Sequence, residues 1–151
     1  MNLSFQPLWP VTMVVVCCCW GFIAFRDWRT MRIRTRDVLL VFAVLASMIA
    51  VQSIVQESMQ GFLALLGAAG YYLLFRLVYF SGQLGGGDVR LAALLGLVHG
   101  WYGFPHVVLA LLLIVAIPAI WGIVLKVWQK KSTFPYAPGM CLGSVAGMII
   151  L

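Results

Sequence analysis

The chain carries four acidic side chains, Asp27, Asp37, Glu57 and Asp88, among its 151 residues. Asp27 follows the first strongly apolar stretch and Asp88 precedes the fourth, so a bundle of helices could bring both carboxyl groups to one depth. Ionisable groups at membrane depth are costly, and those that persist usually have a function. Because carboxyl groups serve as general acids and bases, Asp27 and Asp88 are the first candidates for chemistry.

Three consecutive glycines, Gly85, Gly86 and Gly87, stand directly before Asp88. Glycine leaves the backbone without side-chain obstruction, so an extended peptide could approach the Asp88 carboxylate closely. The alternative is structural: Asp88 would be the N-cap of the fourth helix, and the glycines would form the turn before it. A phosphate-binding loop is not indicated, because no Gly-Lys-Ser or Gly-Lys-Thr follows the glycines.

The first two aspartates also have structural interpretations. Asp27 lies among several arginines, which could simply neutralise a carboxylate at the membrane interface. Asp37 follows Thr35, which the pattern predicts to be the N-cap of the second helix. An acid in the first turn of a helix interacts favourably with the helix dipole. We therefore expect a structural role for Asp37 and leave both interpretations open for Asp27.

The histidines and cysteines do not form a metal-binding pattern. His99 and His106 flank a predicted loop without cysteine or acidic neighbours, and the cysteines Cys17 to Cys19 and Cys141 contain no Cys-x-x-Cys pair. Structural zinc sites usually combine four such ligands at short spacings. The sequence therefore predicts no metal site and no disulfide framework.

The composition indicates a membrane protein. Hydrophobic residues make up 64% of the chain and charged residues 9%, whereas about a quarter of the residues in soluble domains are charged. A helix that crosses a bilayer needs about 20 mostly apolar residues. We expect an all-α, polytopic transmembrane bundle in a single domain over residues 1–151, with about six spans near 8–26, 38–55, 61–80, 89–104, 106–128 and 138–151.

All ten cationic residues fall on alternate connections between these spans. They are Arg26, Arg29, Arg32, Arg34 and Arg36, then Arg76 and Arg90, then Lys126, Lys130 and Lys131. By the positive-inside rule, the first, third and fifth loops are cytoplasmic and both termini face the opposite side. Membrane orientation thus accounts for the net charge of +6, and no nucleic-acid partner is expected.

Glycines recur at helical spacing in the fourth and sixth spans, which are the two least clearly defined. Gly139, Gly143 and Gly147 stand four residues apart in the sixth span, and Gly96 and Gly100 repeat this spacing in the fourth. Small residues on one helix face let a neighbouring helix approach closely. The pattern predicts packing surfaces rather than chemistry for these five glycines.

Three segments together resemble the type IV prepilin peptidases, which are intramembrane aspartyl proteases. The segment 85–91, Gly-Gly-Gly-Asp-Val-Arg-Leu, resembles the GxGD motif that contains the second catalytic aspartate of that family. Asp27 with Ile33 six residues later is similar to the first catalytic aspartate and the isoleucine of an Ile-Pro-Asn segment. The segment 134–138, Phe-Pro-Tyr-Ala-Pro, is similar to the opening of the last helix, with Pro135 and Pro138 as its prolines.

The chain departs from the family pattern at three positions. Arg34 and Thr35 stand where Pro and Asn are usual, and Arg90 replaces a lysine. The chain also lacks the paired Cys-x-x-Cys motifs associated with N-methylation in the larger members. It therefore resembles the short, peptidase-only branch, and methyltransferase activity is not expected.

The resemblance implies an aspartic endopeptidase in which Asp27 and Asp88 share one proton. The ionised carboxyl would take a proton from water, and the protonated one would donate a hydrogen bond to the scissile carbonyl. The implied substrate is a prepilin or pseudopilin, which would lose its basic leader at the cytoplasmic face of the bacterial inner membrane. The resemblance also implies that no metal or organic cofactor is needed. Gly85, Gly86, Gly87, Arg90, Pro135 and Pro138 are the further motif or substrate-binding residues that the resemblance implies.

Two functions from other classes remain open at this stage. A non-catalytic scaffold subunit of a pilus or secretion assembly would use the aspartates only as capping groups and the basic loops only to set topology. A transporter is less well supported, since intramembrane ion sites usually lie near the midplane and these acids lie at span ends. The sequence gives no oligomeric state.

Overall fold

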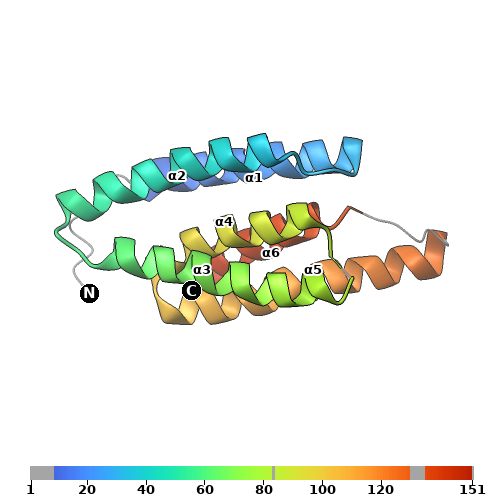
Figure 1. Cartoon of the computed structure of the whole chain (residues 1–151). Coiled ribbons are helices and arrows are strands. Elements are labelled where there is room, and N and C mark those ends of the chain that lie inside the picture. The colour runs from blue at the N-terminus through green and yellow to red at the C-terminus, as the bar shows by residue number, and fades with distance from the viewer. Residues whose placement is uncertain (1–8, 83, 130–134, 151) are drawn as a thin grey trace.

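The computed structural model describes residues 9–82, 84–129 and 135–150, and within them the chain forms six helices. Figure 1 shows them in order: α1 (Trp9–Thr30), α2 (Thr35–Val55), α3 (Gln60–Phe80), α4 (Gly86–Tyr102), α5 (Phe104–Gln129) and α6 (Ala137–Ile150). No strand occurs in these residues. Leu8 and Leu151, at the ends of the predicted first and sixth spans, and Lys130, Lys131 and Phe134 lie outside the described residues. The predicted all-α fold is confirmed.

The surface of the bundle is apolar, as expected for helices that face lipid. Leu40, Leu77 and Ile123 are 68%, 71% and 64% exposed on α2, α3 and α5. Soluble monomers rarely expose large continuous apolar areas. By length and apolarity, three of the described helices can cross a membrane: α2, α3 and residues Phe104–Leu125 of α5, whereas α6 is a shorter apolar helix.

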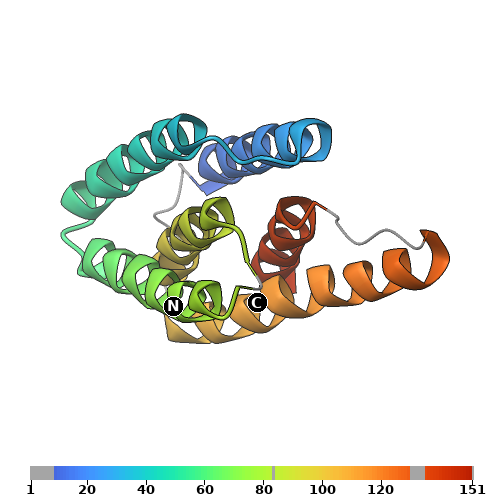
Figure 2. The same ribbon diagram turned by 45° about the vertical axis from the view of Figure 1, so that its right-hand side comes forward.

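Helix α4 is the centre of the bundle. It contacts α2, α3, α5 and α6, and its consecutive residues 94–101 are all buried. A helix that is apolar on every side packs against neighbours all round. This explains why the fourth predicted span is short and still forms a helix, because protein rather than lipid surrounds it (Figures 1 and 2).

Glycines set the close approach of α4 to α3. A Cβ at Gly67 would collide with the carbonyl oxygen of Gly96, and a Cβ at Gly100 would collide with the carbonyl oxygen of Leu63. The packing role predicted for Gly96 and Gly100 is therefore confirmed, and their partner surface is α3.

The glycine stripe of α6 packs against α5 in the same manner. A Cβ at Gly139 would lie 2.7 Å from Cβ of Pro118, and one at Gly147 would lie 2.9 Å from Cβ of Ala110. Between them, a Cβ at Gly143 would lie 2.6 Å from the carbonyl oxygen of Leu113. The predicted packing surface on α6 is confirmed, and it fixes α6 along the middle of α5.

A buried polar contact joins α1, α4 and α6. The indole N–H of Trp20 donates to Ser144 Oγ at 3.1 Å, and this oxygen lies 2.8 Å from Nε2 of His99. His99 and Ser144 are fully buried, and Trp20 is 1% exposed. A buried hydrogen-bonded network specifies one arrangement of its helices, because leaving its groups unpaired in an apolar interior is costly. His99 is thus a packed core residue of α4.

Helices α1 and α2 form a pair along one side of the other four, as both views show (Figures 1 and 2). The amide of Gln52 donates to Thr12 Oγ1 at 2.8 Å and joins α1 to the C-terminal part of α2. At the opposite end, α1 ends at Thr30 and the chain reverses through Met31, which has a φ of 51°. The α1–α2 pair therefore presents its short connection, residues 31–34, to one end of the bundle.

Gly67→Ala should lower the stability of the protein, whereas Gly70→Ala, one turn along the same helix, should not. The added methyl at Gly67 meets the α4 backbone, and overpacking of this kind costs about 1–3 kcal/mol. The methyl at Gly70 meets nothing within 4 Å. Detergent-induced unfolding followed by circular dichroism measures the difference. Equal stability of the two variants would contradict the described α3–α4 contact.

Candidate active site

The end of α1, the α1–α2 connection and the starts of α4 and α6 meet at one end of the bundle. A Cβ on Gly87, at the start of α4, would lie 2.8 Å from Cβ of Ile33 in the α1–α2 connection. The guanidinium of Arg90 donates to Thr35 Oγ1 at 2.9 Å, and the first residue of α6, Ala137, contacts Asp27 near the end of α1. The three segments that resemble family motifs are therefore brought together in space.

Asp27 lies in the last turn of α1 and faces the start of α6. Its side chain is buried, with 5% exposure, and its Oδ2 accepts a hydrogen bond from the backbone N–H of Ala137 at 3.2 Å. The first N–H groups of a helix have no partner within the helix and favour negative charge. Asp27 was expected just after the first helix, but α1 continues to Thr30, so the helix itself holds the side chain in place.

Asp88 lies in the first turn of α4, and its carboxylate accepts a hydrogen bond from the backbone of the N-cap residue. The backbone N–H of Gly85 donates to Asp88 Oδ2 at 3.1 Å, and the N–H of Asp88 donates to the Gly85 carbonyl at 3.1 Å. The N-cap residue is Gly85. The interpretation of Asp88 as the N-cap is therefore wrong in position, since Asp88 is the third residue of the helix and bonds back to the cap.

The two aspartates influence each other electrostatically. Both lie just outside the apolar stretches of their helices. Burial raises the pKa of Asp88 to about 6; the hydrogen bond from Gly85 opposes this rise, and the negative charge of Asp27 adds to it. Burial also raises the pKa of Asp27, and the hydrogen bond from Ala137 partly offsets the increase. Raised pKa values favour the protonated form of each carboxyl group, and the charge of Asp27 makes the ionisation of Asp88 less favourable, as paired acid and base chemistry requires.

The glycines before Asp88 differ in how closely other residues approach them. Gly87 permits the close approach of Ile33, whereas a Cβ at Gly86 would make only ordinary van der Waals contact, with a ring carbon of Tyr79 at 3.9 Å. Gly86 and Gly87 are already helical. The expectation of a glycine loop is thus corrected: two of the three glycines form the first turn of α4, and their lack of side chains brings Asp88 beside the α1–α2 connection.

The proline-rich opening of α6 adjoins both aspartates. Pro135 is buried and precedes the helix, and Pro138 is half-buried in its first turn. Proline fixes φ near the helical value and suits the beginning of a helix. Burial raises the pKa of Tyr136, and the charge of Asp88 raises it further. Ala137 binds Asp27 while Tyr136 lies within the field of Asp88, so this segment lines the carboxyl pair.

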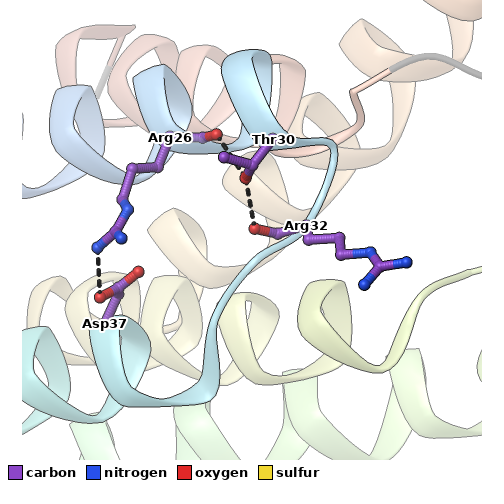
Figure 3. Close-up of polar contacts among 4 residues, drawn as sticks. All are labelled: Arg26, Thr30, Arg32 and Asp37. Atoms are coloured by element: carbon purple, nitrogen blue, oxygen red, sulfur yellow. Dashed lines mark hydrogen bonds and ion pairs between the residues drawn. The ribbon is translucent and has the colours of Figure 1, made fainter.

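Asp37 has a structural partner, as Figure 3 shows. The guanidinium of Arg26 reaches from α1 to Oδ1 of Asp37 at 2.8 Å. The Thr30 hydroxyl lies 2.9 Å from the carbonyl oxygen of Arg26 and 3.0 Å from that of Arg32, which holds the connection between the helices. Arg26 therefore neutralises Asp37 rather than Asp27. Asp37 lies in the first turn of α2, as predicted.

The prediction for Thr35 is wrong. The N-cap of α2 is Arg34, whose extended backbone has φ −77° and ψ 131°, and it makes no side-chain capping bond. Thr35 is the first helical residue, and its hydroxyl accepts from Arg90 instead. The long side chain of Arg90 thus joins α4 to α2 at the position where the family usually has an asparagine.

Sequence reasoning missed two contributors to the site. The Ala137 N–H is a backbone donor, and only its place between two prolines in the sequence marks it as a helix start. Tyr136 is marked only by the same segment. Among the described residues, no group of three or more His, Cys, Asp or Glu side chains is placed to hold a metal ion. The site thus consists of two carboxyl groups, helix starts and a tyrosine.

One known protein family matches most of this chain. The model of the type IV leader peptidase family matches residues 14–123, a range that includes both Asp27 and Asp88 and ends before the α6 prolines. None of the curated proteins and none of the solved structures compared with the chain matches it significantly. The family match extends over most of the sequence, from α1 into α5, and the chain belongs to the type IV leader peptidase family.

Proposed function

We propose that this membrane peptidase is an aspartic endopeptidase whose catalytic groups are Asp27 and Asp88. The observation that carries the proposal is the convergence of two buried or half-buried carboxyl groups from α1 and α4 at the start of α6. Asp37 and Glu57, the other acids, do not join them: Asp37 pairs with Arg26, and Glu57 lies in the α2–α3 connection.

The pair has the properties that peptide hydrolysis requires. With one proton between them, the ionised carboxyl takes a proton from water as the water oxygen attacks the peptide carbonyl carbon. The protonated carboxyl donates a hydrogen bond to the carbonyl oxygen, where negative charge develops. The C–N bond then breaks as the leaving amine receives a proton, and the pair returns to its singly protonated form.

The substrate we propose is a prepilin or pseudopilin with a short basic leader before an apolar helix. The end of the bundle that holds the aspartates also carries Arg29, Arg32, Arg34, Arg36 and Arg90, so by the positive-inside rule it faces the cytoplasm. A substrate helix lying in the bilayer would place its leader junction at this depth. We propose cleavage at the cytoplasmic face of the bacterial inner membrane, without methyl transfer.

Asp27→Asn and Asp88→Asn should each abolish cleavage of a prepilin by membranes that contain the protein. Asparagine keeps the size of aspartate and can still accept the bond from Gly85 or Ala137, but it cannot take a proton from water. Members of a catalytic unit fail together, so each single change should cost nearly as much as both. Mass spectrometry of the product gives the cleavage position and would reveal any added methyl group.

Asp37→Asn is the matched control for the two aspartate variants. It removes a partly exposed ion pair, which is worth about 0–1 kcal/mol of stability, and it should leave cleavage near normal. Normal processing by all three variants would favour a scaffold protein in which Asp88 only caps α4. Loss of activity in Asp37→Asn alone would show that the first catalytic aspartate has been misassigned.

The rate of cleavage should depend on pH as a bell-shaped curve. When both carboxyls are protonated there is no base, and when both are ionised there is no hydrogen-bond donor. Because the pKa of Asp88 is raised to about 6, kcat/KM should fall as the pH rises past that region. A bound peptide excludes water and raises the pKa further, so kcat should fall at a higher pH than kcat/KM. A profile that is flat from about pH 4 to about pH 9 would contradict a shared proton.

Reporter fusions should place the active-site end in the cytoplasm. A reporter that is active only outside the cytoplasm should be silent when fused after Arg36, in the first turn of α2, and active when fused after Glu57, in the α2–α3 connection. The two fusion points lie at opposite ends of α2. The reverse pattern would contradict the proposed orientation and the site of cleavage.

A further inference from the structure

An open cavity of about 160 Å³ lies between α3 and α4, near the end of the bundle that holds the aspartates. Its lining comes from both helices: Tyr72, Arg76, Tyr79, Gly86, Val89 and Arg90. The two arginines and the two tyrosines are also exposed at the surface. The cavity therefore combines two cationic groups and two phenol hydroxyls in a recess that opens to the surroundings.

The cavity is separate from the carboxyl pair. Gly86, Val89 and Arg90 are spaced by three and four residues, so they share one face of α4. Asp88 is two residues from Gly86, about 200° around the helix, and faces away from them. Asp88 interacts with Asp27 and Tyr136 of the active site, whereas the cavity faces α3.

Neither arginine of the cavity has a carboxylate partner among the described residues. Arg76 donates to the hydroxyl of Tyr72 at 3.3 Å and lies over the ring of Tyr79, 5.9 Å from its centroid. Arg90 donates through one nitrogen to Thr35 Oγ1. Within the described part of the chain the one ion pair is Arg26–Asp37, which includes neither arginine of the cavity. The positive charge of the cavity is thus uncompensated, and each guanidinium has donors left.

We infer that this cavity binds the phosphate group of an anionic phospholipid headgroup. Guanidinium groups bind phosphate oxygens through paired, charge-assisted hydrogen bonds. Basic pockets between membrane helices on the cytoplasmic side bind such headgroups, and tyrosines are common at that depth. Gly86, the first residue of α4, lines the cavity and so adds the positive end of a helix dipole beside it.

The charge of the cavity selects among lipids. Two uncompensated guanidiniums favour a headgroup with a net negative charge, such as phosphatidylglycerol. In phosphatidylcholine the same phosphate is balanced by a quaternary ammonium, which has no acidic partner in the lining. A free phosphate ion shares the recognised chemistry but lacks the acyl chains that would lie along the apolar surface of α3, so the lipid is the ligand we assign.

Native mass spectrometry of the detergent-purified full chain tests the assignment. The protein is titrated with short-chain phosphatidylglycerol, with phosphatidylcholine of the same chain length, and with inorganic phosphate. Phosphatidylglycerol should bind about tenfold more tightly than phosphatidylcholine, and Arg76→Gln and Arg90→Gln should each weaken its binding about tenfold, as loss of a charge-assisted hydrogen bond predicts. Unfolding curves confirm that each variant remains folded.

Arg36→Gln is the matched control, since Arg36 is an exposed arginine at the same end of the bundle and does not line the cavity. It removes the same charge and should leave the preference for phosphatidylglycerol unchanged. Equal binding of the two lipids, or equal weakening by Arg36→Gln and Arg90→Gln, would overturn the site. Binding of inorganic phosphate alone, with the same dependence on Arg76 and Arg90, would overturn the lipid as the ligand.

Discussion

The hydrogen bond from the Ala137 N–H to Asp27 is the contact on which the site depends. A carboxylate buried at the end of an apolar bundle needs a donor, and α1 provides none at its own C-terminal end, where the helix dipole is negative. The start of α6 provides it. This bond holds Asp27 against the start of α6, where burial raises the pKa of Tyr136 and the charge of Asp88 raises it further. Two acids 61 positions apart in sequence are thus brought to one helix start.

The close helix contacts at glycines place Asp27 and Asp88 at the same end of the bundle. Gly67 and Gly96 bring α4 against α3, while Gly139 and Gly143 bring α6 against α5. In a membrane, helices associate through close packing and interhelical hydrogen bonds rather than through the hydrophobic effect. The Trp20–Ser144–His99 contact then links α1 and α4 to α6 below the site. The positions of Asp27 and Asp88 follow from this packing, and their chemistry follows from the positions.

The sequence predicted the features that repeat locally and missed those that depend on distant contacts. Apolar runs predicted the six helices, and the spacing of Gly139, Gly143 and Gly147 predicted a packing face, because both patterns repeat with the helix. The observed helix ends differ from the predicted span ends by a few residues, because polar residues that flank an apolar run, such as Arg29, can either continue the helix or lie outside it. The N-cap at Thr35 was wrong because Arg90, far away in sequence, binds that hydroxyl. The Ala137 donor has no side-chain signal at all.

If Asp27 and Asp88 lie in one site, cysteines at these two positions should form a disulfide, and this test does not depend on activity. Cys17, Cys18, Cys19 and Cys141 are first replaced by serine or alanine, and cysteines are then introduced at 27 and 88, or at 57 and 88 as the control. Under mild oxidation in membranes, the 27–88 pair should cross-link rapidly within one chain. The 57–88 pair, at opposite ends of the bundle, should not. Cross-linking at equal rates, or none at 27–88, would contradict the account.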